Sequence, residues 1–252
     1  MKALITGASS GIGRDMAYYL ASKNIDLILV ARRKEELVKI KKELTNVSVE
    51  VMPLDLTEMD NLELLYNEVS KKDIDILINN AGFGLFGEFS ETNLERELKM
   101  IDLNIIALHY LTKKFLIDFV EKDSGYILNV ASSAGFMSGP KLSTYYATKN
   151  YVCRLTEAIY QELKMKKSNV HISALCPGPV ETEFNKVANG SFKTKAADSK
   201  YVAKYAIDKI FKGKLIIVPT FFMKLSLLAA KLAPRKLMLR IVYSIQDSKM
   251  KK

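Results

Sequence analysis

Short apolar runs alternate along the chain with longer amphipathic segments. The apolar runs, interpreted as strands, cover residues 2–6, 26–30, 47–52, 75–79, 125–130, 170–175 and 214–219. The amphipathic segments, interpreted as helices, cover residues 12–22, 34–44, 58–71, 91–119, 144–166 and 199–211. Continuously apolar strands that alternate with helices are typical of a parallel sheet covered on both faces. The pattern predicts an α/β protein with a doubly wound sheet of seven parallel strands, which binds its ligand at the carboxyl ends of the strands.

Positive charge gathers at the end of the chain. Of the net charge of +10, the segment 212–252 carries ten basic residues and one acid, a balance of +9. Residues 1–211 therefore carry about one net charge, and we expect a balanced body over residues 1–219 followed by a basic helical extension over residues 220–252.

Composition excludes several classes of protein. A hydrophobic content of 48% with 26% charged residues is that of a globular chain. A strand that starts at residue 2 leaves no room for a signal peptide, and we see no run of ~18 uncharged apolar residues, so a cytoplasmic protein is expected. Cys153 and Cys176 lack CxxC spacing, which predicts buried, reduced thiols and no metal site. His109 and His171 are far apart in the sequence and are interpreted as ordinary imidazoles.

The first predicted strand runs into a glycine-rich turn. The sequence T-G-A-S-S-G-I-G covers residues 6–13 and lies between a strand and a helix. Gly7, Gly11 and Gly13 let the backbone turn tightly and approach a phosphate, and the helix that follows offers free N–H groups to that phosphate. Such a turn between a strand and a helix predicts a dinucleotide site.

Further landmarks end the other predicted strands, and together they carry a resemblance. D-L-T is at 55–57, N-N-A-G at 79–82, L-N-V-A-S-S-A-G at 128–135, Y-x-x-x-K at 145–149 and P-G-P-V-E-T at 177–182. In this order the motifs resemble the short-chain dehydrogenase/reductase family over about residues 2–219. The resemblance implies a Rossmann-type sheet and an oxidoreductase activity. The tail resembles, more weakly, a bacterial subgroup that includes long-chain 3-oxoacyl reductases.

Two adjacent tyrosines precede a lysine, and helix geometry alone barely separates them. Tyr145 is four residues before Lys149 and Tyr146 is three, so on a helix both face the lysine. The family resemblance selects Tyr145, because its tyrosine lies four residues before the lysine and its serine 13 residues before the tyrosine, at Ser132. The resemblance also implies that Asn104 holds a water linked to the lysine. Tyr146 is interpreted as a core or interface residue.

These residue types suit the reduction of a carbonyl group. The nicotinamide supplies a hydride, so the protein must supply a proton to the oxygen. The ordinary pKa of tyrosine, about 10, is too high for a good base. An ammonium group beside it, at Lys149, favours the phenolate. Ser132 would hydrogen-bond the oxygen as negative charge develops on it.

The end of the second strand predicts which dinucleotide binds. The sequence there is V-A-R-R, with no acid before Glu35. A carboxylate would repel the 2′-phosphate of NADP, whereas a guanidinium binds it, so NADP(H) is predicted with Arg32 as the main contact; Arg33 is either a second contact or a solvated charge. The resemblance implies a full set of cofactor-binding residues: Gly7, Ser9, Ser10, Gly11, Ile12, Gly13, Arg32, Arg33, Asp55, Leu56, Asn80, Ala81, Gly82, Tyr145, Lys149, Pro177, Gly178, Val180 and Thr182.

Residues 183–198 lack a clear period and follow the cofactor motif, so we expect a substrate lid there. Candidate residues for the pocket lining are Phe136, Met137, Phe184 and Phe192, and ordinary packing is the equal alternative for each of them.

Residues 221–247 are interpreted as two helices that meet at Pro234, and a helical wheel places Lys224, Lys231 and Arg235 on one stripe. This extension either packs on the body or on a second subunit, or binds an anionic membrane, or docks an acidic acyl-carrier protein.

Two functions are thus compared. The first is an NADP(H)-dependent oxidoreductase that acts on a carbonyl or alcohol substrate, for instance a 3-oxoacyl compound or another apolar ketone. The second is a catalytically weak NADP-binding regulatory or membrane-recruited module. The family resemblance also implies a homodimer or homotetramer formed through the helices at 91–119 and 144–166. Nucleic acid is not expected as a partner, because the tail lacks aromatic residues interleaved for stacking.

Overall fold

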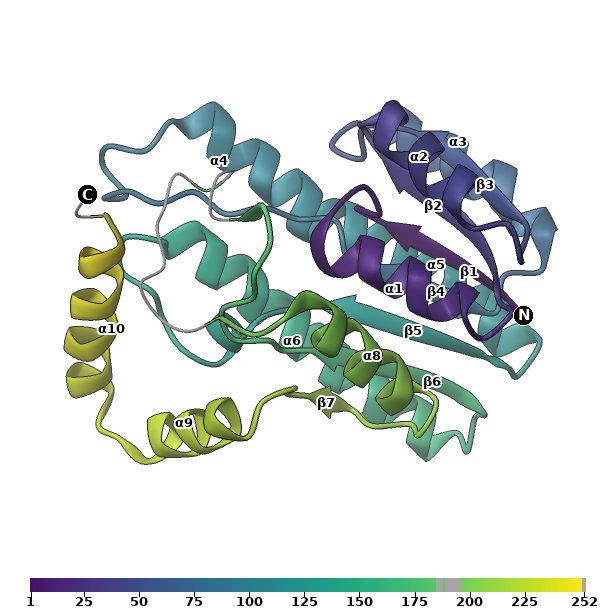
Figure 1. Ribbon diagram of the computed structural model, residues 1–252. Helices are drawn as coiled ribbons and strands as arrows, with labels where there is room; N and C mark the ends of the chain where they lie inside the picture. Colours follow the sequence, from purple (N-terminus) through teal and green to yellow (C-terminus); the bar gives the residue numbers. More distant parts are fainter. Residues whose placement is uncertain (185–187, 189–195, 251–252) are drawn as a thin grey trace.

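The computed structural model describes residues 1–184, 188 and 196–250. Its centre is one sheet of seven parallel strands in the order β3-β2-β1-β4-β5-β6-β7 (Figure 1). The strands are β1 Lys2–Thr6, β2 Asp26–Ala31, β3 Val49–Pro53, β4 Ile76–Asn79, β5 Gly125–Val130, β6 Val170–Leu175 and β7 Ile216–Ile217. All seven predicted strands are confirmed, and β7 is shorter than the apolar run that predicted it.

Helices cover both faces of the sheet (Figure 1). They are α1 Gly11–Ala21, α2 Lys34–Glu43, α3 Met59–Val69, α4 Leu94–Ile101, α5 Leu108–Glu121, α6 Ser143–Met165, α8 Ser199–Ile210, α9 Phe221–Leu232 and α10 Arg235–Met250. Three short helical segments, Ser70–Lys72, Asp102–Ala107 and Ser133–Phe136, complete the helical structure of the described residues.

Alternate residues of each strand serve two separate cores. On β1, Ala3 and Ile5 join the core formed with α1, α2 and α8, whereas Leu4 joins the core formed with α3, α5 and α6. All three side chains are fully buried. This arrangement is why the strands read as continuous apolar runs in the sequence.

The chain reverses its direction across the sheet between β1 and β4. Strands β2 and β3 are added on one side of β1, and β4 to β7 on the other. A crevice forms at such a point, outside the carboxyl ends of the strands, because the loops after β1 and β4 lead to opposite faces. The glycine-rich turn and the N-N-A-G motif therefore meet there.

Two predictions about helices need correction. The segment 91–119 is not one regular helix, because the turns at Asp102–Ala107 are π-helical and separate α4 from α5. The prediction that Lys224, Lys231 and Arg235 form one stripe is also wrong, because α9 ends at Leu232 and Arg235 starts a separate helix, α10.

Candidate active site

A cavity of about 460 Å³ lies at the carboxyl edge of the sheet. Its lining contains every predicted catalytic and cofactor-binding residue except Gly13 and Asn104. The predicted residues among them, which are up to 175 residues apart from Gly7 to Thr182, thus converge on one space. Residues whose part in the lining was not predicted include Phe83, Leu103, Leu142, Glu183 and Gln246.

The glycine-rich turn is held in place by the loop after β4. Gly7 and Gly11 adopt left-handed backbone angles, with φ of 65° and 54°. The amide nitrogens of Asn80 and Ala81 each donate to Thr6 Oγ1 at 3.0 Å. The side chain of Asn80 donates to the carbonyl oxygens of Thr6 and Gly7, at 3.0 and 3.1 Å.

Gly13 lies behind this turn and not in the cavity wall. A Cβ atom at Gly13 would lie 2.3 Å from Asn80 Nδ2 and 2.6 Å from Gly7 O. The glycine is therefore required so that α1 can pack against the two loops.

The start of α1 fits an anionic group. Ser10 is the N-cap residue but makes no side-chain cap hydrogen bond, and the first turn holds no acidic side chain. The N–H groups of a helix start that lacks a capping side chain suit a phosphate. Because the cavity includes Ser10, Gly11 and Ile12, these residues fit the pyrophosphate of a dinucleotide.

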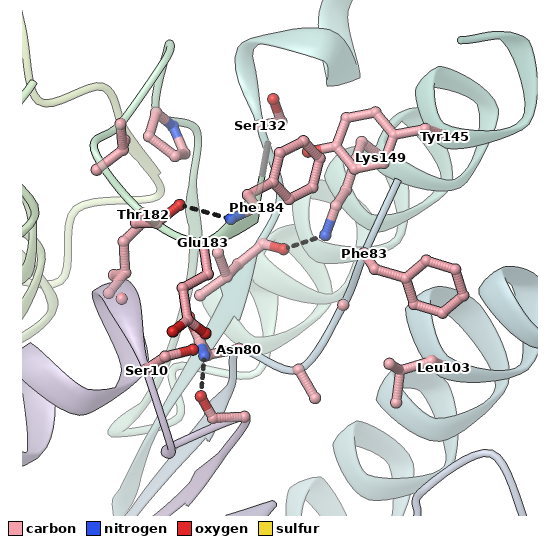
Figure 2. Close-up of a pocket in the computed structure, with 18 of the residues that line it drawn as sticks. Ser10, Asn80, Phe83, Leu103, Ser132, Tyr145, Lys149, Thr182, Glu183 and Phe184 are labelled. Atoms are coloured by element: carbon pink, nitrogen blue, oxygen red, sulfur yellow. Dashed lines mark hydrogen bonds between the residues drawn. The ribbon is translucent and has the colours of Figure 1, made fainter. Parts of the chain in front are cut away.

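Tyr145, Lys149 and Ser132 meet at the other end of the cavity (Figure 2). One turn of α6 separates Tyr145 from Lys149, and the Lys149 ammonium lies 5.7 Å from the centre of the Tyr145 ring. The Ser132 side chain hydrogen-bonds to Tyr145. Both α6 residues are buried, with exposed fractions of 8% and 4%. The predicted phenol, ammonium and hydroxyl are thus brought together.

Burial acts on the two ionisable groups in opposite ways. It raises the pKa of Tyr145 well above its ordinary value, against the smaller effect of the Ser132 hydrogen bond, which lowers that pKa. Burial lowers the pKa of Lys149 to about 8, because a charged group is disfavoured away from water. Lys149 Nζ also donates to the carbonyl oxygen of Val130 at 2.8 Å. At neutral pH the site therefore holds a protonated phenol beside an ammonium.

Tyr146, the neighbouring tyrosine, makes different contacts. It is buried as predicted, and its hydroxyl accepts a hydrogen bond from Gln246 of α10 at 2.6 Å. Its ring packs over Gly139, where a Cβ atom would lie 2.2 Å from the ring. The two tyrosine rings meet edge to face at 6.3 Å.

Asn104 lies in the π-helical segment and is fully buried. Its Oδ1 accepts from Phe83 N at 3.1 Å, and its Nδ2 donates to Phe83 O at 2.9 Å and to Thr148 Oγ1 at 3.1 Å. Thr148 in turn donates to the carbonyl oxygen of Tyr145 at 2.7 Å. Asn104 thus ties the loop after β4 to α6. π-Helical turns are frequent at functional sites, but the sequence pattern did not reveal this one.

The two arginines after β2 differ in their contacts. The side chain of Arg32 is 70% exposed and lies 3.7 Å from Asp55. Arg33 donates to Ser9 Oγ from Nε and Nη2 at 3.3 and 3.2 Å, and pairs with Glu183 at 2.9 Å. Both line the cavity, so either can reach a phosphate there.

The remaining candidates have mixed outcomes. Phe184 lines the cavity with its ring centre 5.3 Å from that of Tyr145. Phe136 and Met137 pack in the neighbouring apolar clusters, and Phe192 lies outside the described residues, as does most of the predicted lid. A Cβ atom at Gly178 would lie 2.4 Å from Met223 Cε, so this glycine makes room for α9.

None of the two cysteines and two histidines lines the cavity. The Cys153 and Cys176 sulfurs lie 3.7 Å apart, both buried and both free. His109 bonds to the Tyr151 hydroxyl and His171 stacks on Tyr126. Across residues 1–184, 188 and 196–250, no group of three His, Cys, Asp or Glu side chains is arranged to hold a metal ion.

Comparisons with known proteins agree with this geometry. The model of the short chain dehydrogenase family matches residues 1–191. The NADP-dependent 3-hydroxy acid dehydrogenase of Schizosaccharomyces pombe is 37% identical over 200 residues, which are 77% of this chain and 76% of that protein. A short-chain dehydrogenase from Sphingobium yanoikuyae, solved in complex with NADPH, has a TM-score of 0.85 at 31% identity and 94% coverage of both chains.

A third relative is the bulky-bulky ketone specific alcohol dehydrogenase of Comamonas testosteroni, with a TM-score of 0.79 at 28% identity. The match covers 94% of this chain and 93% of that one. The chain belongs to the short-chain dehydrogenase family. It is an oxidoreductase of this type, an enzyme acting on alcohol or carbonyl groups.

Proposed function

We propose that the protein reduces a ketone to a secondary alcohol with NADPH. The observation that carries this proposal is the convergence of Tyr145, Lys149 and Ser132 at one end of a cavity whose other end is built for a dinucleotide. NADPH, when bound, supplies the hydride. The ketone, one hydride and one proton give the alcohol, so the protein must provide the proton.

Each of the three side chains has a separate role in the reduction of the carbonyl group. Ser132 hydrogen-bonds the oxygen as it gains negative charge. Tyr145, a protonated phenol at neutral pH, donates its proton to that oxygen. The Lys149 ammonium, 5.7 Å from the Tyr145 ring, stabilises the phenolate that remains. Asn104 keeps Phe83 and Thr148 in place beside this group.

The proposed cofactor preference rests on Arg32 and Arg33. Arg32 is the principal contact in this proposal, because its long, exposed ion pair with Asp55 leaves the guanidinium available. Arg33 holds Ser9 and Glu183 and supports the same position. The relative from S. pombe is named as NADP-dependent and the one from S. yanoikuyae was solved in complex with NADPH, which supports the same preference.

Replacement of Arg32 by alanine is expected to weaken NADPH binding by about 10- to 100-fold, because a hydrogen bond to a charged group contributes about 1.5–3 kcal/mol. NADH binding should change little, since NADH has no 2′-phosphate. Fluorescence titration with each dinucleotide measures both constants. Arg14→Ala is the matched control, because Arg14 pairs with Asp15 and does not line the cavity. Wild-type protein that binds NADH as tightly as NADPH would contradict the preference.

The substrate is proposed to be largely apolar. Phe83, Leu142 and Phe184 line the cavity and belong to the same apolar cluster as Tyr145. The relative from C. testosteroni acts on bulky ketones, which supports a large substrate. A screen of NADPH oxidation across alkanones, 3-oxoacyl thioesters and cyclic ketones tests this class.

Oligomers are proposed to form through the helices between β4 and β6. Apolar side chains are exposed there, at Leu94, Leu98, Ile106 and Ile117, with Tyr151 on α6. Exposed apolar groups gathered on neighbouring helices are typical of subunit interfaces. A sedimentation measurement of mass tests this proposal, and a monomer at micromolar concentration would contradict it.

The C-terminal helices carry a second exposed apolar surface. On α9, Phe221 and Phe222 are 80% and 76% exposed, and Leu225, Leu228 and Leu232 continue the same surface. No residue of α9 is buried, whereas Met223 and Leu227 pack on the body. Lys224 and Lys231 are exposed on α9, and Arg235, Lys236 and Arg240 are exposed on α10. None of the helices among the described residues is long and apolar enough to cross a bilayer.

We propose that this surface binds an anionic membrane. An apolar surface flanked by basic groups suits an interfacial helix. The start of α9 packs against Gly178, beside the cavity, so an apolar substrate would enter from the same side. The protein would then be located inside the cell, at the surface of a membrane.

The double variant Phe221→Ser, Phe222→Ser is expected to lower binding to phosphatidylglycerol vesicles by about tenfold or more, since two large exposed aromatic groups no longer enter the bilayer. Co-sedimentation with such vesicles, and with neutral vesicles, measures the loss. Leu64→Ser removes an exposed apolar group on α3, outside this surface, and should have no effect. Equal binding by wild type and the double variant would contradict the proposal. If the double variant keeps vesicle binding but no longer self-associates, the surface is a subunit interface. If it keeps vesicle binding but no longer binds an acidic acyl-carrier protein, the surface is the docking site of that protein.

A further inference from the structure

One polar group in the wall of the cavity has no assigned role. Gln246 of α10 is 97% buried and lines the cavity together with Ser132 and Tyr145. Its Nε2 donates to the hydroxyl of Tyr146 at 2.6 Å. Its Oε1 is also buried and has no hydrogen-bond partner among the described residues. A buried amide oxygen without a partner costs about 1–3 kcal/mol, so a ligand that supplies a donor gains from it.

Tyr146 adds the complementary half of this feature. Its hydroxyl accepts from Gln246, which leaves the phenolic proton available to an acceptor. Tyr146 lines the same cavity and its ring meets that of Tyr145, so the pair lies beside the proposed proton donor. Together the two side chains offer one acceptor and one donor at the end of an apolar cavity.

The contacts of α10 hold Gln246 in this position. Val242, one turn earlier on α10, is buried in the cluster that contains Leu142, Tyr145 and Tyr146. Asp247, the next residue, forms an ion pair with Lys141, which also pairs with Glu88 at 3.3 Å. The Lys141 ammonium lies 4.8 Å from the centre of the Tyr243 ring. These contacts fix the helix on both sides of the amide.

We propose that Gln246 and Tyr146 form a polar subsite that binds a neutral hydroxyl or secondary amide carried by the ketone substrate. Each of these groups has a donor for Gln246 Oε1 and an acceptor for the Tyr146 hydroxyl. The pair carries no net charge, so it gives no ionic attraction to a carboxylate or an ammonium. This inference rests on the proposed reduction and adds that the substrate has a second, polar end.

The test compares matched ketones. Methyl ketones of six to twelve carbons that end in a hydroxyl are compared with the ketones of equal length that end in a methyl group, and a second series ends in an N-methylamide. For at least one length, wild-type kcat/KM should favour the polar ketone by about tenfold or more, because the apolar ketone leaves the buried amide without a partner. The better series distinguishes a hydroxyl from an amide.

Gln246→Leu, which keeps the volume of the side chain, is expected to reduce that preference to about twofold or less. Tyr146→Phe should reduce it similarly. The readout is the ratio of kcat/KM for the polar ketone to kcat/KM for the apolar ketone. A variant that only loosened the packing of α10 would lower both values together and leave this ratio unchanged. Ser248→Ala is the matched control on α10, with an exposed hydroxyl bonded to Ile245 O, and should keep the wild-type ratio.

Three outcomes decide between the proposals. Equal wild-type rates for polar and apolar ketones at every length would overturn the subsite and leave the reduction intact. A polar preference that survives Gln246→Leu would likewise overturn it. No NADPH-dependent turnover of any ketone in the series, or in the wider substrate screen, would count against the proposed reduction itself.

Discussion

The variant Tyr145→Phe is expected to lose about 10²- to 10⁴-fold in the rate of ketone reduction, while NADPH still binds. The phenol is the group that donates the proton in the proposed reaction, and positioned proton donors contribute about this factor. A phenylalanine ring retains the contacts with Phe184 and Tyr146, so the cavity should keep its shape. Steady-state NADPH oxidation measures the rate, and fluorescence titration measures binding.

Tyr151→Phe is the control for this variant. Tyr151 lies on the same helix, is partly exposed and bonds to His109 at a distance from the cavity. Its loss should leave the rate within about twofold. Full activity in Tyr145→Phe would refute the assignment of the proton donor. Dinucleotide binding by a wild-type chain with no turnover would instead favour a regulatory module.

A second large effect is expected from Lys149→Met, with a loss of about 10²-fold and a changed pH profile. Burial lowers the pKa of Lys149 to about 8. The ammonium is therefore present below about pH 8 and lost above it, and the phenolate left by proton donation then lacks its stabilising charge. The value of kcat/KM for NADPH, which reports ionisations of the free enzyme, should fall as the pH rises past about 8.

The profile of Lys149→Met should show no fall near pH 8, because the titrating group is gone. Lys164→Met, at the exposed end of the same helix, should keep the wild-type profile. A wild-type profile that is flat between pH 7 and 9.5, or a fall near pH 8 that persists in Lys149→Met, would contradict the role of this ammonium.

Much of the fold was predictable because the central strands are buried on both faces. The run at 2–6 is apolar at every position from Ala3 to Ile5, and it forms β1, which pairs in parallel with β2 and β4. The sequence also predicted that the motifs following the strands lie close together, because parallel strands place their carboxyl ends at one edge of the sheet. The choice of Tyr145 over Tyr146 needed the family resemblance, since both lie on the same side of the helix as Lys149.

What the sequence did not reveal arises from contacts between distant segments. Asn104 lies in π-helical turns, and its amide holds the backbone of Phe83, 21 residues away. No periodicity in the sequence signals that contact. Gln246 was part of a basic tail in the sequence, and its burial depends on Tyr146, 100 residues away. Glu183 was also unforeseen, since its partner Arg33 precedes it by 150 residues.

Transfer of deuterium tests the central claim most directly. A ketone that the wild-type enzyme turns over is incubated with NADPH deuterated at the transferring position of C4, and the alcohol is analysed by mass spectrometry. The account predicts one deuterium on the carbinol carbon of the wild-type product, and a rate of labelling that falls by about 10²-fold or more in Tyr145→Phe. An alcohol without deuterium, or labelling as fast in Tyr145→Phe as in the wild type, would contradict it.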